Sequence, residues 1–178
     1  DGLGAPPVLV DLGTVAGLDG LVVDGSGIRI GAGVTLARLA ADPDIARALP
    51  AVAQAAAAIA APGHRSVATV GGNLCVDTRC VYYNQSEWWR RSNAYCLKHG
   101  GDTCQVAPQG TRCHAAFAGD LAPALLVAGA AVAIAGPRGP RTVALDPLYR
   151  DDGRAHLTLD VGEIVAAVTR RANRVELP

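Results

Sequence analysis

TVGGNL, from Thr69 to Leu74, is followed directly by CVDTRCVYYNQSEWWRRSNAYCLKHGGDTCQVAPQGTRCHAAFAG, from Cys75 to Gly119. The second stretch contains all five cysteines of the chain and six of its seven aromatic residues. Packing alone would spread such residues through a core. We therefore expect residues 75–119 to form an insertion that carries a cofactor, set into an aliphatic α/β framework.

Composition excludes several classes of function. The chain has 178 residues, of which 50% are hydrophobic, so we expect one globular domain. Lys and Arg number 16, as do Asp and Glu, and no long run of like charge occurs. This balance predicts no nucleic-acid partner and no anionic membrane surface, and it favours small ligands or protein partners.

Targeting signals point the same way. The longest uncharged stretch, Leu121 to Pro137, is shorter than the roughly 20 apolar residues that cross a bilayer, and no secretion signal is recognisable, so we expect a cytoplasmic protein. The chain has no Met and begins at Asp1 within sequence typical of a domain interior. We expect it to be a piece of a longer protein.

Strand and helix patterns alternate on both sides of the insertion. Runs of β-forming residues bounded by turns predict strands at Pro6–Leu12, within Gly20–Leu36, in a β-rich run at His64–Leu74, and at Ala130–Gly136, Arg141–Leu145 and Glu163–Arg171. Capping residues and prolines predict helices after Thr35, at Ala51–Ala61 and at Asp120–Gly129.

Four of the cysteines, Cys80, Cys96, Cys104 and Cys113, stand as C-x15-C-x7-C-x8-C, with Cys75 outside. Five is an odd number and a cytoplasmic chain keeps its thiols reduced, so a metal centre is favoured over disulfides. Structural zinc sites usually contain close C-x2-4-C pairs, whereas four thiolates match a [4Fe-4S] cluster by ligand count. Zinc and ordinary buried thiols remain alternatives.

Basic residues surround these cysteines, and they have two interpretations. They could offset the charge of a thiolate cluster and tune its potential, or they could form a solvated surface. The residues are Arg79, Arg90, Arg91, Lys98 and Arg112. His114, next to Cys113, is a weaker candidate ligand because four cysteines are available.

The Gly-Gly-Asn sequence of TVGGNL also has two interpretations. Two successive residues without Cβ allow the backbone to approach a phosphate or a flat ring closely. The alternative is a tight turn that requires positive φ. Neither a P-loop nor a Rossmann glycine motif follows a strand in this sequence.

Together, TVGGNL and GDLAPALLVAGAAVAI (Gly119 to Ile134) resemble the flavin-binding domain of the xanthine dehydrogenase and carbon monoxide dehydrogenase class of molybdenum hydroxylases. In most of that family the two motifs lie close together. Here the cysteine stretch separates them, and it resembles the insertion of 4-hydroxybenzoyl-CoA reductase β subunits, which binds a [4Fe-4S] cluster. The resemblance runs from about Leu9 to Arg171.

The resemblance implies an α+β fold of the PCMH-like type, with a mixed or antiparallel sheet, flanking helices and a cysteine-rich loop insertion. Residues 1–74 and 120–178 would form the FAD-binding domain, and residues 75–119 the [4Fe-4S]-binding insertion. The four spaced cysteines would be the cluster ligands. The implied flavin contacts are Thr69, Gly71, Gly72, Asn73, Leu74 and Asp120.

The resemblance also implies a function in electron transfer. Electrons would pass from a ferredoxin-like donor through the cluster and FAD to a [2Fe-2S] small subunit and a molybdopterin-containing large subunit, which reduces 4-hydroxybenzoyl-CoA to benzoyl-CoA. The alternatives are the FAD subunit of another hydroxylase of this class and a non-catalytic zinc-binding module. We expect truncation at both ends, with a Gly-rich flavin loop before Asp1 and a further domain after Arg171.

Overall fold

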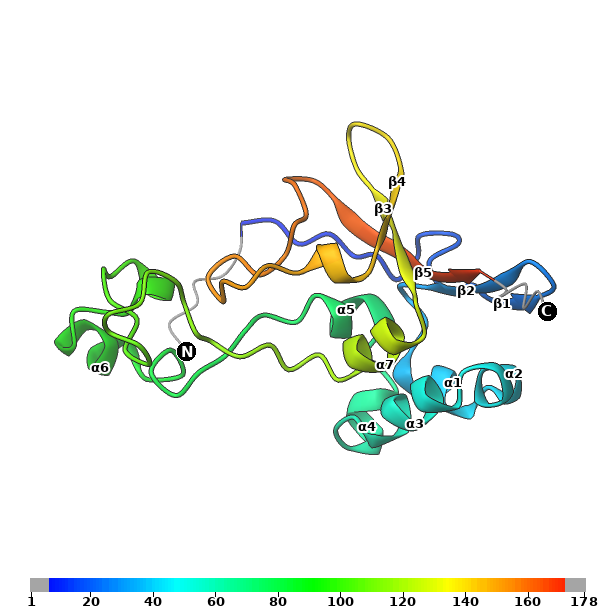
Figure 1. Cartoon of the computed structure of the whole chain (residues 1–178), viewed down its shortest axis with the longest axis horizontal. Coiled ribbons are helices and arrows are strands. Elements are labelled where there is room, and N and C mark those ends of the chain that lie inside the picture. The colour runs from blue at the N-terminus through cyan, green and yellow to red at the C-terminus, as the bar shows by residue number, and fades with distance from the viewer. Residues whose placement is uncertain (1–6, 172–178) are drawn as a thin grey trace, which may run out of the picture. The chain divides into compact units, whose positions relative to one another are not determined.

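The computed structural model describes residues 7–171 (Figure 1). The chain divides into two compact units. The insertion unit comprises 7–10, Val76–Ala118 and Tyr149–Thr158. The frame unit comprises Asp11–Cys75, Gly119–Leu148 and 159–171. The segment Tyr149–Thr158, far from the cysteines in sequence, is therefore grouped with the insertion.

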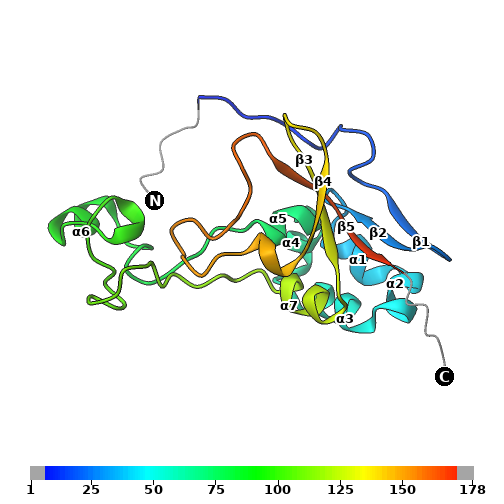
Figure 2. The same ribbon diagram turned by 45° about the horizontal axis from the view of Figure 1, so that its top comes forward.

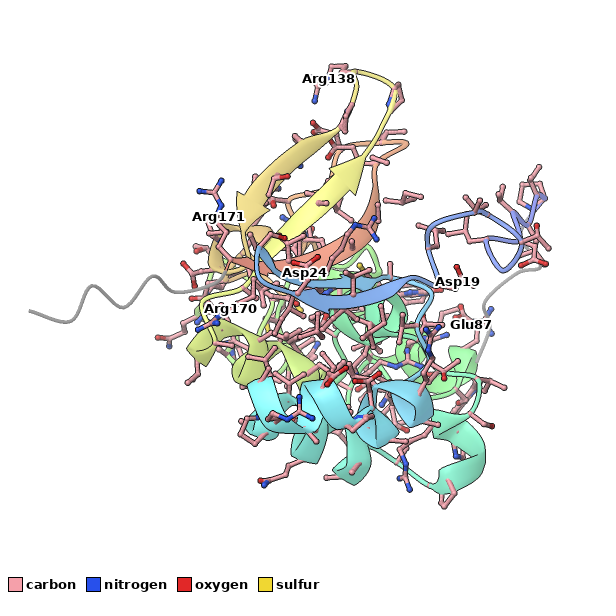
Figure 3. The ribbon with its side chains drawn as sticks, turned by 90° about the vertical axis from the view of Figure 1, so that its right-hand side faces the viewer. Asp19, Asp24, Glu87, Arg138, Arg170 and Arg171 are labelled. Atoms are coloured by element: carbon pink, nitrogen blue, oxygen red, sulfur yellow. The ribbon has the colours of Figure 1, made fainter. Side chains whose placement is uncertain are left out.

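The frame unit contains a five-stranded antiparallel sheet with the strand order β1-β2-β5-β3-β4. Its strands are β1 (Leu21–Asp24), β2 (Gly27–Gly31), β3 (Ala131–Ala135), β4 (Arg141–Ala144) and β5 (Ile164–Arg171). Figure 3 shows Arg138 on the loop that joins β3 to β4, and Arg170 and Arg171 at the end of β5. The strands expected within Gly20–Leu36 and after Gly129 are confirmed.

Helices of the frame unit gather on one side of this sheet (Figures 1 and 2). They are α1 (Leu36–Ala41), α2 (Pro43–Ala48), α3 (Pro50–Ala58), α4 (Pro62–Arg65), α5 (Val70–Leu74) and α7 (Leu121–Val127), with a 3-10 turn, η2, at Asp146–Leu148. Thr35 caps α1 as expected, because its side chain accepts a hydrogen bond from Arg38 N. Apolar side chains from the helices and from β2, β3 and β5 are buried together as the core.

Two segments were expected as strands and are not. Residues 7–12 form no strand, and Pro6 lies outside the described residues. Val8, Leu9 and Val10 are 72%, 85% and 77% exposed, so this apolar run has neither a sheet partner nor a core to pack against.

The β-rich run expected at His64–Leu74 is wrong as well, because it forms the end of α4 and all of α5. Pro62 starts α4 with its fixed φ, and the Thr69 hydroxyl caps α5 by accepting from Gly72 N at 3.1 Å. A proline at the start of α4 and the Thr69 cap of α5 thus override the strand preference of the Val and Thr residues in this run.

The insertion unit has little regular structure. It contains α6 (Glu87–Ser92), which is labelled in Figure 2, and a 3-10 turn, η1 (Leu97–His99). Its entry and exit are paired: Arg79 and Ala116 exchange two backbone hydrogen bonds of 2.9 Å. Within residues 7–171, every helix falls short of the length and hydrophobicity needed to cross a membrane.

Candidate flavin and metal sites

A cavity of about 390 Å³ lies in the frame unit. It collects residues from the turn after β2, the start of α5 and the start of β5. Three of the six expected flavin contacts, Thr69, Gly71 and Gly72, line it. The other lining residues are Leu12, Gly13, Val15, Leu18, Asp19, Ala32, Gly33, Cys75, Leu159, Glu163, Ile164 and Val165.

The absence of Cβ at Gly71 permits a close backbone approach beside this cavity. A Cβ built on Gly71 would lie 2.7 Å from the Ala32 Cβ, closer than such atoms pack. Gly71 N donates to Ala32 O at 2.8 Å, and Gly72 N donates to the Thr69 hydroxyl. Both amides bond within the protein, and Gly71 serves the close packing of α5 on the turn after β2.

The other three expected flavin contacts lie outside this cavity. The Asn73 side-chain oxygen accepts from Leu121 N at 3.0 Å, so it caps α7 across an interval of 48 residues. Leu74 is 0% exposed and belongs to the core. Asp120 is exposed at the start of α7, and among residues 7–171 its side chain caps no helix.

The cavity also contains residues that sequence reasoning did not assign to it. Ala32 and Gly33 follow β2, where Gly31 has no room for a side chain because a Cβ there would lie 2.1 Å from Leu18 O. The repeated glycines Gly31 and Gly33 at the end of a predicted strand were the signal that could have found this turn. Cys75, set aside as unassigned, lines the same cavity.

Glu163 adds a fixed negative charge to the cavity lining. Arg141 donates to both of its carboxylate oxygens at 2.8 and 2.7 Å, and Asp160 N donates to one of them at 2.9 Å. These hydrogen bonds, of which those from Arg141 have the largest effect, lower the pKa of Glu163 to about 2. The carboxylate is therefore ionised at neutral pH although its side chain is only 5% exposed.

The insertion unit brings the four spaced cysteines together. Cys80, Cys96, Cys104 and Cys113 all line one small cavity, whose other walls include Lys98 and Tyr82. Cys96, Cys104 and Cys113 are buried at 7%, 4% and 4% exposure, and all five cysteines are free thiols. Among residues 7–171, no three Cys, His, Asp or Glu side chains converge closely enough for one metal ion. The cysteines thus surround a shared space without meeting at a point.

Backbone amides donate to the sulfurs of this site. Tyr83 N donates to Cys80 Sγ at 3.3 Å, and Ala115 N donates to Cys113 Sγ at 3.4 Å. Burial acts to raise the pKa of Cys104, but backbone amides led by that of His114 outweigh it and the pKa is lowered. Donors aimed at sulfur stabilise thiolates over thiols.

Opposing effects act at Cys113. Burial is the largest cause and raises its pKa, with the neighbouring Cys104 and Cys80 acting in the same direction, while Ala115 N and the Lys98 charge act against it. Sulfurs close enough to raise each other's pKa are suited to sharing one cationic group, whose charge removes that repulsion. His114 is not part of this cavity lining and lies instead in a more open pocket with Arg112 and His156.

Strained backbone precedes Cys96, the second of the four spaced cysteines. Ala94 and Tyr95 have φ of 54° and 60°, in the left-handed region that non-glycine residues rarely adopt. Each such residue costs on the order of 1 kcal/mol, and strain of this kind is concentrated at functional sites. The bend delivers Cys96 to the cysteine cavity.

The donor sets fit the two groups that the sequence resemblance implies. A cavity of about 390 Å³ with a mostly apolar lining suits a flavin in the frame unit. Four cysteines with amide donors suit an iron–sulfur cluster in the insertion unit.

Comparison with known proteins identifies the family. Residues 1–169 match the model of the FAD binding domain in molybdopterin dehydrogenase. The chain is 34% identical over 174 residues to the aldehyde oxidoreductase FAD-binding subunit PaoB of Escherichia coli K12, covering 92% of this chain and 54% of that protein. It is 46% identical over 69 residues to the putative xanthine dehydrogenase FAD-binding subunit XdhB of the same organism, covering 38% of this chain and 23% of that protein. The chain therefore spans about half or less of these relatives.

Solved structures show the same fold. A Cu,Mo-CO dehydrogenase matches with a TM-score of 0.66 and 23% identity, over 96% of this chain and 46% of that chain. Quinoline 2-oxidoreductase of Pseudomonas putida 86 matches with a TM-score of 0.64 and 20% identity, over 96% and 46%. These likenesses confirm the expected α+β fold with an antiparallel sheet and flanking helices. The chain belongs to the family of FAD-binding domains of molybdopterin dehydrogenases.

Proposed function

We propose that this chain is the FAD- and [4Fe-4S]-binding part of an electron-transfer subunit in a molybdenum-dependent 4-hydroxybenzoyl-CoA reductase. The observation that carries the cluster is the single cavity lined by all four cysteines of the C-x15-C-x7-C-x8-C pattern. Family membership supports FAD. The relatives with FAD-binding subunits support the class of complex, in which a molybdopterin subunit and a [2Fe-2S] subunit are the partners.

Each group has a separate place in the chain. Cys80, Cys96, Cys104 and Cys113 would hold the cluster, with Tyr83 N and Ala115 N orienting two of the sulfurs. The turn after β2 and the start of α5 would bind FAD. When bound, a flavin exchanges one or two electrons and an iron–sulfur cluster exchanges one, which suits them to relay electrons from a ferredoxin-like donor. We place the protein in the cytoplasm, where such thiols stay reduced.

Metal analysis of protein purified without oxygen tests the cluster. We expect about four irons and four acid-labile sulfides per chain, with a broad brown absorbance, by ligand count. Cys96→Ser should lose the iron. Cys75→Ser is the matched control and should keep it, because Cys75 lines the flavin cavity. A colourless preparation with stoichiometric zinc would overturn the cluster and favour the structural zinc module.

The substrate is tested on the complex isolated from its native host. The proposal expects reductant-dependent conversion of 4-hydroxybenzoyl-CoA to benzoyl-CoA. The second candidate, another hydroxylase of this class, is favoured by relatives named as aldehyde oxidoreductase, xanthine dehydrogenase and nicotine 6-hydroxylase subunits. Oxidation of an aldehyde or heteroaromatic substrate, with none of the acyl-CoA reduction, would select that candidate.

A further inference from the structure

Lys98 differs from the exposed basic residues of the insertion because its charge is buried. Its side chain is 5% exposed, while Arg79 and Arg91 are exposed. It also lines the cavity formed by the four cysteines. A charge removed from water is costly unless it is paired and hydrogen-bonded, so its presence here requires an explanation.

Three acceptors fix the ammonium group. Lys98 Nζ donates to Asp77 Oδ1 at 2.8 Å, to the Thr78 hydroxyl at 2.8 Å and to Gly153 O at 2.7 Å. These bonds use all three of its donors. The charge also lies 5.2 Å from the centre of the Tyr83 ring, whose own backbone amide donates to Cys80 Sγ. The ammonium is thus held in one place, and the Lys98 side chain lines the cysteine cavity closely enough for its charge to act on Cys113.

The charge of Lys98 is only partly neutralised by its neighbours. Of its three acceptors, only Asp77 is anionic, and the Asp77 side chain is 53% exposed, so water screens the carboxylate. The ammonium itself is shielded from water and from salt. A net positive potential therefore extends toward the cysteine cavity.

We propose that Lys98 is a positioning residue that raises the reduction potential of the iron–sulfur cluster held by the four cysteines; this inference rests on the cluster proposed above. A cluster with four thiolates is anionic, and reduction adds one electron from the donor without changing its ligands. A fixed positive charge stabilises the reduced form more than the oxidised form. Arg91, which is exposed on α6, has a screened charge and a smaller effect.

The test is a potentiometric titration of the full chain, purified without oxygen and followed by the EPR signal of the reduced cluster. We expect K98Q to lower the midpoint potential by the equivalent of about a tenfold change in the reduction equilibrium constant, ~59 mV for one electron. The matched control R91Q removes the same charge and should shift it several times less. K98R should restore most of the wild-type potential.

A second variant covers the case in which K98Q does not fold. D77N removes the exposed counter-charge and leaves Lys98 in place, so it should raise the potential. If K98Q and R91Q shift the midpoint potential equally, or if D77N leaves it unchanged or lowers it, the proposed role of Lys98 is wrong. Neither result would contradict the presence of the cluster. Wild-type protein without iron and sulfide would overturn both proposals, and it is recognised before any variant is titrated.

Discussion

The frame unit and the insertion unit differ in what fills their interiors. The frame buries aliphatic side chains almost completely, with Leu36, Leu39, Leu121 and Leu125 at 0–1% exposure. Among the described residues of the insertion unit, the buried side chains are those of three cysteines, Ala115 and the polar residues Thr78, Arg90 and His156. Some of its larger apolar side chains are exposed, with Trp88 at 68% and Val81 at 66%.

This difference separates two sources of stability. Apolar burial contributes about 25 cal/mol per Å² and stabilises the frame without any ligand. An interior of thiols and hydrogen-bonded polar groups gains little from burial, because each group must recover its lost hydration. We therefore expect the insertion unit to depend on its bound group, as small metal-binding domains do.

The largest expected effect tests the difference between the two units directly. Cys96→Ser, or removal of iron by a chelator, should abolish amide hydrogen-exchange protection across Val76–Ala118 while the sheet and helices of the frame keep theirs. Hydrogen exchange with mass spectrometry measures both regions at once. Equal loss in both units, or full protection in both after iron removal, would contradict the proposed dependence.

Leu125→Ala tests the frame. Leu125 is 1% exposed on α7, and truncating a buried Leu costs ~2–5 kcal/mol. Urea unfolding should show this loss, while the cluster absorbance of the folded variant remains at its wild-type intensity. The neighbour Leu126 is 38% exposed, so Leu126→Ala should cost under about 1 kcal/mol. Similar losses of unfolding free energy at the two positions would contradict the assignment of Leu125, and not Leu126, to the core of the frame.

Gly71→Ala tests the contact between α5 and the turn after β2. The added Cβ would lie 2.7 Å from the Ala32 Cβ, and overpacking of this kind costs ~1–3 kcal/mol. We expect reduced stability together with lower FAD content after purification. The control is Gly63→Ala, where an added Cβ meets none of the described atoms within 4 Å. If both variants retain equal flavin, the cavity is not the flavin site.

Asn73→Ala removes the cap of α7. The hydrogen bond from Leu121 N would be lost, and caps contribute about 1 kcal/mol. Thermal or urea unfolding measures the change. Asp120→Ala provides the comparison, because the Asp120 side chain makes no cap bond among the described residues. A larger loss for Asp120→Ala than for Asn73→Ala would reverse this assignment.

The smallest effect is a pH dependence confined to acid. The pKa of Glu163 is lowered from 4.5 to about 2, so its contribution to stability is complete above about pH 4.5 and is lost as the pH falls toward 2. Glu163→Gln should lower stability at neutral pH and flatten the stability profile between those pH values. Unfolding midpoints across this range measure it, and parallel profiles for the two proteins would refute it.

Sequence patterns predicted the frame well where hydrophobic periodicity and caps agreed. β1, β2 and α1 follow directly from the glycine turns and from the Thr35 cap. The run His64–Leu74 misled because Val and Thr favour strands, whereas Pro62 and the Thr69 hydroxyl impose helical turns locally. Helix α2 was not predicted, although Pro43 suits the first turn of a helix and Asp42 caps it.

The candidate sites were predictable to different degrees. Spacing singled out the four cysteines, which do line one cavity, because ligand type and number are visible in sequence. Only half of the expected flavin contacts line the cavity of the frame unit. Ala32 and Glu163 reach this cavity because they flank the paired strands β2 and β5, a pairing that the sequence does not display, and Cys75 reaches it from the end of α5. Burial distinguishes Lys98 and Arg90 from the exposed Arg79 and Arg91, and no local pattern encodes the burial of a single basic residue.

The hydrogen bond between Asn73 and Leu121 has a consequence for how such a chain can acquire new parts. It joins the two ends of the frame between which residues 75–119 are inserted. The backbone pair between Arg79 and Ala116 joins the two ends of the insertion itself. Lengthening a loop whose ends are already tied costs little, about 0.6 kcal/mol per doubling. The frame therefore tolerates a long excursion at this point, and a separate module can be gained there while the hydrogen bond that joins the two ends of the frame is kept.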